Sequence, residues 1–130
     1  MKKLLLIVLL SSSASIASSN EDSEFNKFVS NSLSVKPNQN ETYVIDLFGK
    51  QNQAKKSTDT SSFEGIKKID YLLNFSSPEN NPHHYMSIAI YKHKVIATLM
   101  CYEFMAAPGA FGEKCFPVQS FWQKYKSGNF

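Results

Sequence analysis

Arginine is absent from this sequence, and all 14 of its basic residues are lysines. The arginine side chain is the one best suited to bidentate recognition of phosphate and carboxylate groups. Two of the lysines, Lys2 and Lys3, belong to the N-terminal segment, and the other 12 are nearly balanced by 11 Asp and Glu residues. The lack of arginine and of a large positive charge argues against a nucleic-acid-binding protein.

Recognisable catalytic motifs are absent as well. The sequence has no GxSxG, HExxH or phosphate-loop pattern. His83 and His84 precede a predicted strand at residues 85–91 and His93 follows it, so about 20 Å separates the two groups. We expect ordinary surface histidines, no metal site and no cofactor. Whether the protein is an enzyme stays open at this level, with the balance against catalysis.

The sequence has no apolar run long enough to span a bilayer, but an unbroken run of seven aliphatic residues lies near the N-terminus. Lys2 and Lys3 precede seven branched apolar residues at 4–10 and a run of mostly small residues at 11–19, which is the layout of a signal peptide. Cleavage is expected after Ala17 or Ser19. The apolar run is much shorter than the ~20 residues that a transmembrane helix needs, and no later segment is long enough to span a bilayer.

The predicted organisation is therefore a signal peptide at 1–19 and a single small globular α+β domain at 20–130. Such a chain has enough residues to bury a modest core of its own, but not enough for a second domain. We expect the mature protein to be exported, either to the periplasm or to the medium, with no membrane span after signal cleavage.

Cysteine is scarce, with only Cys101 and Cys115. An even number of cysteines in an exported chain most simply indicates a disulfide. This bond would close a loop of about 15 residues, worth on the order of 3 kcal/mol in the chain-entropy model. A catalytic thiol is the alternative, but neither cysteine lies in a recognisable nucleophile context.

Helical periodicity is found at both ends of the mature chain. Residues 21–34 carry apolar side chains at helical spacing, with acidic residues in the first turn. After Pro117, a second set of apolar residues recurs at i, i+3, i+4 and i+7, which predicts a short C-terminal helix from Val118 to Tyr125. A final strand is the alternative for this last segment.

Strand patterns occupy the middle of the chain. Residues 42–48 are rich in β-branched and aromatic side chains and predict a strand. Residues 69–75 alternate in polarity, which predicts another strand. The apolar runs 85–91 and 95–104 are separated only by Lys92-His93-Lys94 and predict a hairpin.

The polar residues 50–62 are expected to form an exposed connection between strands. The order of helix, four strands and helix predicts an α+β fold. We expect an antiparallel sheet of about four strands, with an N-terminal and a C-terminal helix packed on it.

The segment between the cysteines is the candidate binding site. Residues 106–110 and Gly112 are small residues or proline and are expected to form a loop whose ends are held together by the disulfide. A constrained loop loses less entropy when it docks, and an apolar tip is unusual without a partner. We take Met105, Pro108 and Phe111 as the binding residues. The alternative is that Met105 and Phe111 fold back onto the core.

These patterns favour a small exported protein without catalytic activity that binds another protein through the disulfide-tethered loop. Inhibitors, immunity-type protectors and adaptors are proteins of this kind. The alternative is a small secreted hydrolase or ligand-binding protein with a cleft between the sheet and its helices. A structural component of an envelope or secretion assembly is a further hypothesis, and it predicts stable self-association.

Overall fold

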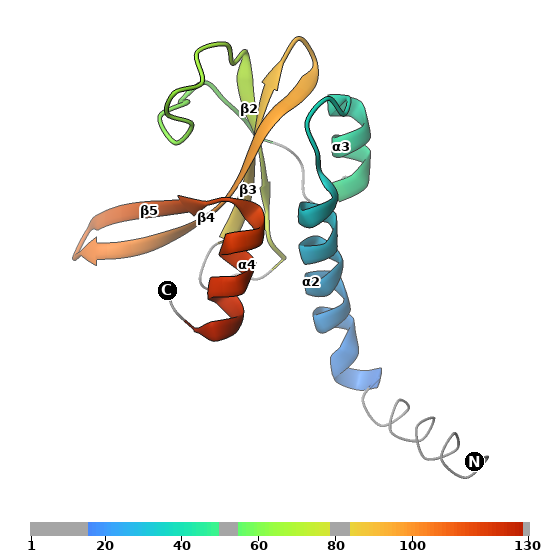
Figure 1. Cartoon of the computed structure of the whole chain (residues 1–130). Coiled ribbons are helices and arrows are strands. Elements are labelled where there is room, and N and C mark those ends of the chain that lie inside the picture. The colour runs from blue at the N-terminus through green and yellow to red at the C-terminus, as the bar shows by residue number, and fades with distance from the viewer. Residues whose placement is uncertain (1–15, 50–54, 79–83, 129–130) are drawn as a thin grey trace.

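The computed structural model describes residues 16–49, 55–78 and 84–128 (Figure 1). In chain order the elements are α2 (Ile16–Ser34), α3 (Glu41–Phe48), β1 (Lys55–Ser57), β2 (Tyr71–Ser76), β3 (His84–Tyr91), β4 (Lys94–Ala107), β5 (Ala110–Phe116) and α4 (Val118–Ser127). Most of the predicted signal peptide falls on residues 1–15, which lie outside the described residues. None of the helices in the described part of the chain is long and apolar enough to cross a membrane.

The strands form one antiparallel sheet in the order β1-β2-β3-β4-β5, so each strand pairs with its neighbours along the chain. The predicted α+β class is confirmed, and the described residues form five strands in place of about four and three helices in place of two. All three helices pack on the same face of the sheet, because one core cluster unites their apolar side chains with those of β2, β3 and β4. We call this the helix face and the opposite one the open face.

Aromatic rings make up much of the core on the helix face. Phe48 of α3 stacks on Phe75 of β2 with ring centroids 4.5 Å apart. Trp122 of α4 donates a buried hydrogen bond from Nε1 to the Ser32 hydroxyl of α2 at 2.8 Å. These contacts join all three helices to the sheet or to one another. The helices predicted at 21–34 and after Pro117 are confirmed by α2 and α4, and the alternative of a final strand is wrong. Since α2 begins at Ile16, the acidic residues at 21, 22 and 24 lie beyond its first turn, and the prediction that they occupy the first turn is wrong.

The strand predicted at residues 42–48 is wrong, since this segment forms α3. Val44 and Phe48 lie four residues apart, on one side of the helix, and both are buried in the core, whereas Tyr43 and Ile45 are exposed. The β-branched and aromatic composition favours a strand, but this propensity is weak and depends on context. Burial of one helical face against β2 therefore decides the conformation.

The hairpin predicted from the two apolar runs is confirmed by β3 and β4. Tyr91 pairs with Lys94, and the turn residues Lys92 and His93 both have positive φ, 50° and 65°. Positive φ at both central positions is typical of a type I′ turn, whose twist matches that of the strands. The backbone N–H of Lys92 also donates to Asp70 Oδ2 at 2.7 Å, which fixes the turn beside the start of β2.

The prediction that residues 50–62 form an exposed polar connection is wrong for part of this segment. Residues 50–54 lie outside the described residues, but Lys55–Ser57 form β1 and pair with β2. The chain then crosses the open face, where Phe63 is 5 % exposed and packs in a small cluster with Leu72 and Ala89. Phe63, with Ile69 packed against the same cluster, thus holds a largely polar loop on the sheet.

Candidate functional site: a disulfide-based hairpin

Cys101 and Cys115 are bonded, as predicted. They lie directly opposite each other on β4 and β5, with their Cα atoms 4.0 Å apart. Cys101 is fully buried. The bond therefore joins the neighbouring strands β4 and β5 directly before the residues that complete their hairpin.

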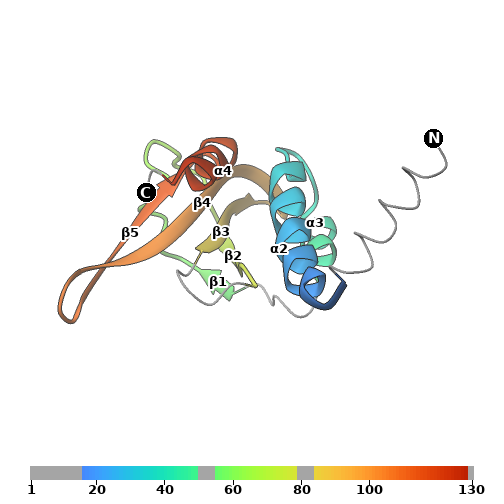
Figure 2. The ribbon, with the colours of Figure 1, turned by 90° about the horizontal axis from the view of Figure 1, so that it is seen from below.

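The loop predicted between the cysteines is wrong, because the chain there continues as paired strands. β4 runs to Ala107 and β5 begins at Ala110, so only Pro108 and Gly109 form the turn. Gly109 has φ 78°, as the third residue of a type II turn requires, and proline suits the position before it. We call residues 103–113 the hairpin arm. Figure 1 and Figure 2 both show the arm projecting away from the sheet and its helices.

Gly112 was expected in the loop and instead lies within β5, opposite Phe104. The Phe104 ring covers it so closely that a Cβ atom at this position would lie 2.8 Å from the ring's Cζ. An aromatic ring packed over a glycine across a strand pair compensates for the missing side chain. The small residues of the arm look like a loop in the sequence, but cross-strand pairing of this kind and the disulfide allow them to form strands.

The candidate binding residues Met105 and Phe111 face each other across the arm on its open face. They are 62 % and 70 % exposed, the highest fractions among the large exposed hydrophobic residues of the described chain. Pro108 is exposed in the turn. The alternative that Met105 and Phe111 fold back onto the core is wrong. The arm thus presents an apolar pair at a distance from the hydrophobic core.

Two carboxylates flank the base of the arm on the same face. Glu103 and Glu113 lie directly opposite each other on β4 and β5. Glu113 accepts hydrogen bonds from the Tyr85 hydroxyl and from the Ser62 hydroxyl, the latter at 3.2 Å. Burial raises the pKa of Tyr85, and the hydrogen bond and negative charge of Glu113, with the charges of Glu103 and Asp59, raise it further. These contacts connect the arm to β3 and to the loop over the open face.

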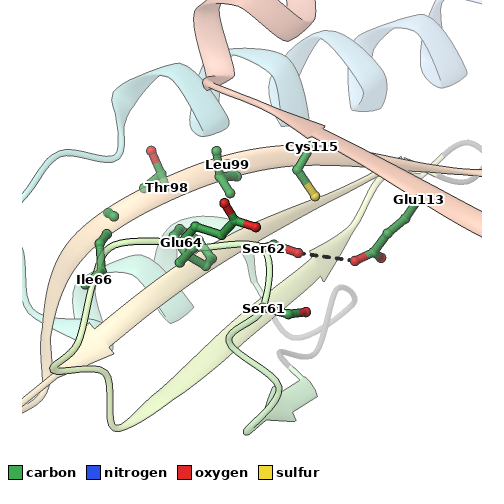
Figure 3. Close-up of a pocket in the computed structure, with 10 residues that line it drawn as sticks. Ser61, Ser62, Glu64, Ile66, Thr98, Leu99, Glu113 and Cys115 are labelled. Atoms are coloured by element: carbon green, nitrogen blue, oxygen red, sulfur yellow. Dashed lines mark hydrogen bonds between the residues drawn. The ribbon is translucent and has the colours of Figure 1, made fainter.

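A shallow groove lies beside the arm on the open face, between the loop and strands β4 and β5 (Figure 3). Its volume is about 510 Å³. Its rim is polar, with Ser62 facing Glu113 and Glu64 close by, and the Cys115 side chain lies at one end. The predicted alternative placed a cleft between the sheet and the helices, whereas this groove lies on the opposite face of the sheet; in the described residues, the main core cluster lies between the sheet and the helices. No sequence pattern predicted the groove, because its residues come from three separate segments of the chain.

A second polar cluster lies at the opposite end of the sheet, where α3 meets the β3–β4 turn. The Tyr71 hydroxyl and His93 Nδ1 both contact the carboxylate of Glu41, which is 9 % exposed. Burial alone would raise the pKa of Glu41, but its contacts with Tyr71 and His93 and the nearby Lys56 lower it overall. Burial and the hydrogen bond to Glu41 raise the pKa of Tyr71 to about 12. The backbone N–H of Glu41 also donates to the His93 carbonyl at 2.9 Å, so this cluster holds α3 on the hairpin.

The histidines are distributed differently from the expectation of three surface residues. His84 is 1 % exposed and packs edge-on against the rings of Phe121 and Tyr125. His93 is exposed and lies at the other end of β3, and His83 lies outside the described residues. In the described segments, no three His, Cys, Asp or Glu side chains are grouped so that they could hold a metal ion.

Comparisons with protein-family models, with curated proteins and with solved structures found no match to this chain.

Proposed function

We propose that this protein is an exported binding module without catalytic activity that recognises another protein through its hairpin arm. The observation that carries the proposal is the pair Met105 and Phe111, which lie side by side and largely exposed on a projecting hairpin. Methionine and aromatic residues are enriched in the buried centres of protein interfaces. A partner with an apolar pocket for these two side chains fits the arm best.

The energetics support this use of the arm. Complete burial of a side chain such as methionine or phenylalanine contributes roughly 1.5–3 kcal/mol. The disulfide limits the conformations of the free arm, so less entropy is lost when it docks. The same bond supports export, because disulfides persist mainly in oxidising compartments.

The test is a pull-down with the oxidised, exported protein, using envelope extract and medium of the cells that produce it, followed by mass spectrometry. The decisive variant is M105A/F111A, which removes both apolar side chains of the arm. A matched control, L33A/Y43A, removes two large hydrophobic side chains that are 47 % and 51 % exposed on α2 and α3.

We expect the wild type and the control variant to retain one stoichiometric protein partner. The arm variant should bind this partner at least about 100-fold more weakly, as expected when two central interface residues are truncated. Equal retention by the arm variant, or the absence of any retained partner with the wild type, would show that the proposal is wrong.

A further inference from the structure

β5 is the last strand in the sheet order, so one of its edges has no neighbouring strand in the described structure. Four of its residues are exposed: Ala110, Phe111, Glu113 and Lys114. The backbone groups along such an edge are available to pair with a strand of another chain.

The register of the arm identifies which backbone groups point outward. In antiparallel sheets the two kinds of residue pair alternate, and the pair without mutual hydrogen bonds has the shorter Cα distance, about 4.5 Å against about 5.5 Å. The Cα atoms of Cys101 and Cys115 are 4.0 Å apart, so this pair is of the kind without mutual hydrogen bonds. The register continues without a shift from this pair to Met105 and Phe111. The N–H and C=O groups of Phe111, Glu113 and Cys115 therefore point away from β4.

The side chains of the same three residues lie on the open face, where they define what an added strand would meet. Phe111 supplies an apolar surface together with Met105. Glu113 lies directly opposite Glu103, and like charges at such positions are unfavourable. Lys114 points to the helix face, where its Nζ lies 5.5 Å from the centre of the Phe104 ring. A cation supplied from outside would relieve the repulsion between the two carboxylates.

A second copy of this chain is a poor occupant for the edge. The two-fold antiparallel registers that pair most of β5 are centred on Gly112, Glu113 or Lys114. Centring on Glu113 or on Lys114 places two like charges opposite each other, and centring on Gly112 places Phe111 opposite Glu113. A different chain can instead place a cationic residue opposite Glu113 and an apolar residue opposite Phe111.

We propose that β5 binds an extended segment of a partner protein as an antiparallel sixth strand, with a Lys or Arg opposite Glu113 and an apolar residue opposite Phe111. This inference rests on the proposed function and specifies the partner's chemistry. Antiparallel addition continues the arrangement of the whole sheet and is slightly more stable per residue than parallel addition. On the helix face, we expect the partner segment to carry an acidic residue opposite Lys114.

The probe is the capped peptide Thr-Ser-Glu-Lys-Thr-Leu-Thr, in which Lys is opposite Glu113 and Leu is opposite Phe111. Its binding is followed by NMR titration of the oxidised, ¹⁵N-labelled protein. We expect shifts and slower hydrogen exchange at the amides of Phe111, Glu113 and Cys115. No change along β5 would overturn the inference.

Two matched peptides test the backbone pairing. N-methylation of the lysine amide removes a donor that should bond to Glu113, whereas N-methylation of the following threonine changes an amide that should point away. We expect the first to weaken binding at least about fivefold and the second less than about twofold. Equal effects of the two methyl groups would contradict strand addition.

The side-chain pattern has its own tests. Exchange of Glu and Lys within the peptide, or Phe111→Ala in the protein, should each weaken binding at least about fivefold. If the exchanged peptide binds as well as the original, the charge assignment is wrong. If these peptide tests fail while the M105A/F111A variant still loses its natural partner, the proposed function stands and strand addition falls. If the peptide tests succeed while the M105A/F111A variant retains its natural partner, strand addition is supported and the proposed function is wrong.

Discussion

Replacement of Cys101 and Cys115 by alanine should lower the free energy of unfolding by about 3 kcal/mol. The two residues are 14 positions apart. In the chain-entropy model, a cross-link closing a loop of about 15 residues restricts the unfolded chain by this amount. Alanine is preferred to serine here because Cys101 is fully buried, and a serine hydroxyl at that position would add a desolvation cost.

The assay is urea unfolding monitored by the fluorescence of Trp122, the single tryptophan. This side chain is 5 % exposed in the helix-face core and therefore reports on global unfolding. For a domain of this size, the expected loss corresponds to a decrease in Tm of roughly 10–20 °C. The control for the substitutions themselves is the wild-type protein after reduction of its disulfide. Its free energy of unfolding should match that of the double-alanine variant.

A loss below about 1 kcal/mol would contradict the chain-entropy estimate, because it would mean that the unfolded chain gains little freedom when the cross-link is removed. The location of the effect provides a second check. Hydrogen exchange in the arm, residues 103–113, should become faster in the variant than exchange in β3, since most residues of the arm are exposed and most residues of β3 are buried. Uniform acceleration throughout the sheet would indicate that the bond stabilises the body and not the arm.

Three further substitutions test other parts of the structure. Glu41→Gln should reduce stability at neutral pH. The folded-state pKa of Glu41 is lowered from its ordinary value of 4.5, so its charge stabilises the folded protein. This stabilisation is fully present above pH 4.5 and is lost as the pH falls through the folded-state pKa. Urea unfolding between pH 3 and 7 should therefore show the difference between wild type and variant shrinking at acidic pH, and a constant difference would contradict this assignment. Trp122→Phe removes the hydrogen bond to Ser32 and should cost about 1–2 kcal/mol in urea unfolding followed by circular dichroism, whereas an unchanged midpoint would mean that this bond contributes nothing. Phe63→Ala should cost about 3 kcal/mol and increase protease cleavage in the loop over the open face, and unchanged resistance would show that Phe63 does not anchor the loop.

Local features were predictable from the sequence where the signal and the structure depend on the same short segment. The C-terminal helix begins directly after Pro117 and is followed by Gly128 in a left-handed conformation, both of which are local helix-boundary signals. The β3–β4 hairpin follows from two apolar runs with a very short separation. The disulfide follows from the even number of cysteines together with predicted export.

Other features depend on contacts between distant segments, and the sequence pattern alone was misleading or silent there. Residues 42–48 have strand-like composition, but α3 forms because the helical conformation buries Val44 and Phe48 in the core, where Phe48 stacks on Phe75 of β2. His84 is buried because α4 places Phe121 and Tyr125 against it. No spacing along the chain indicates that Glu113 meets Tyr85 and Ser62.

The α+β class, the terminal helices, the central hairpin and the cysteine pair could be predicted from the sequence, because periodicity, turn residues and cysteine number act over short distances. The projecting hairpin between the cysteines, with Met105 and Phe111 exposed on one face, became evident only in the folded protein, because small residues have weak conformational preferences of their own. Their conformation is therefore set by cross-strand pairing, by the cover of Phe104 over Gly112 and by the disulfide at the base.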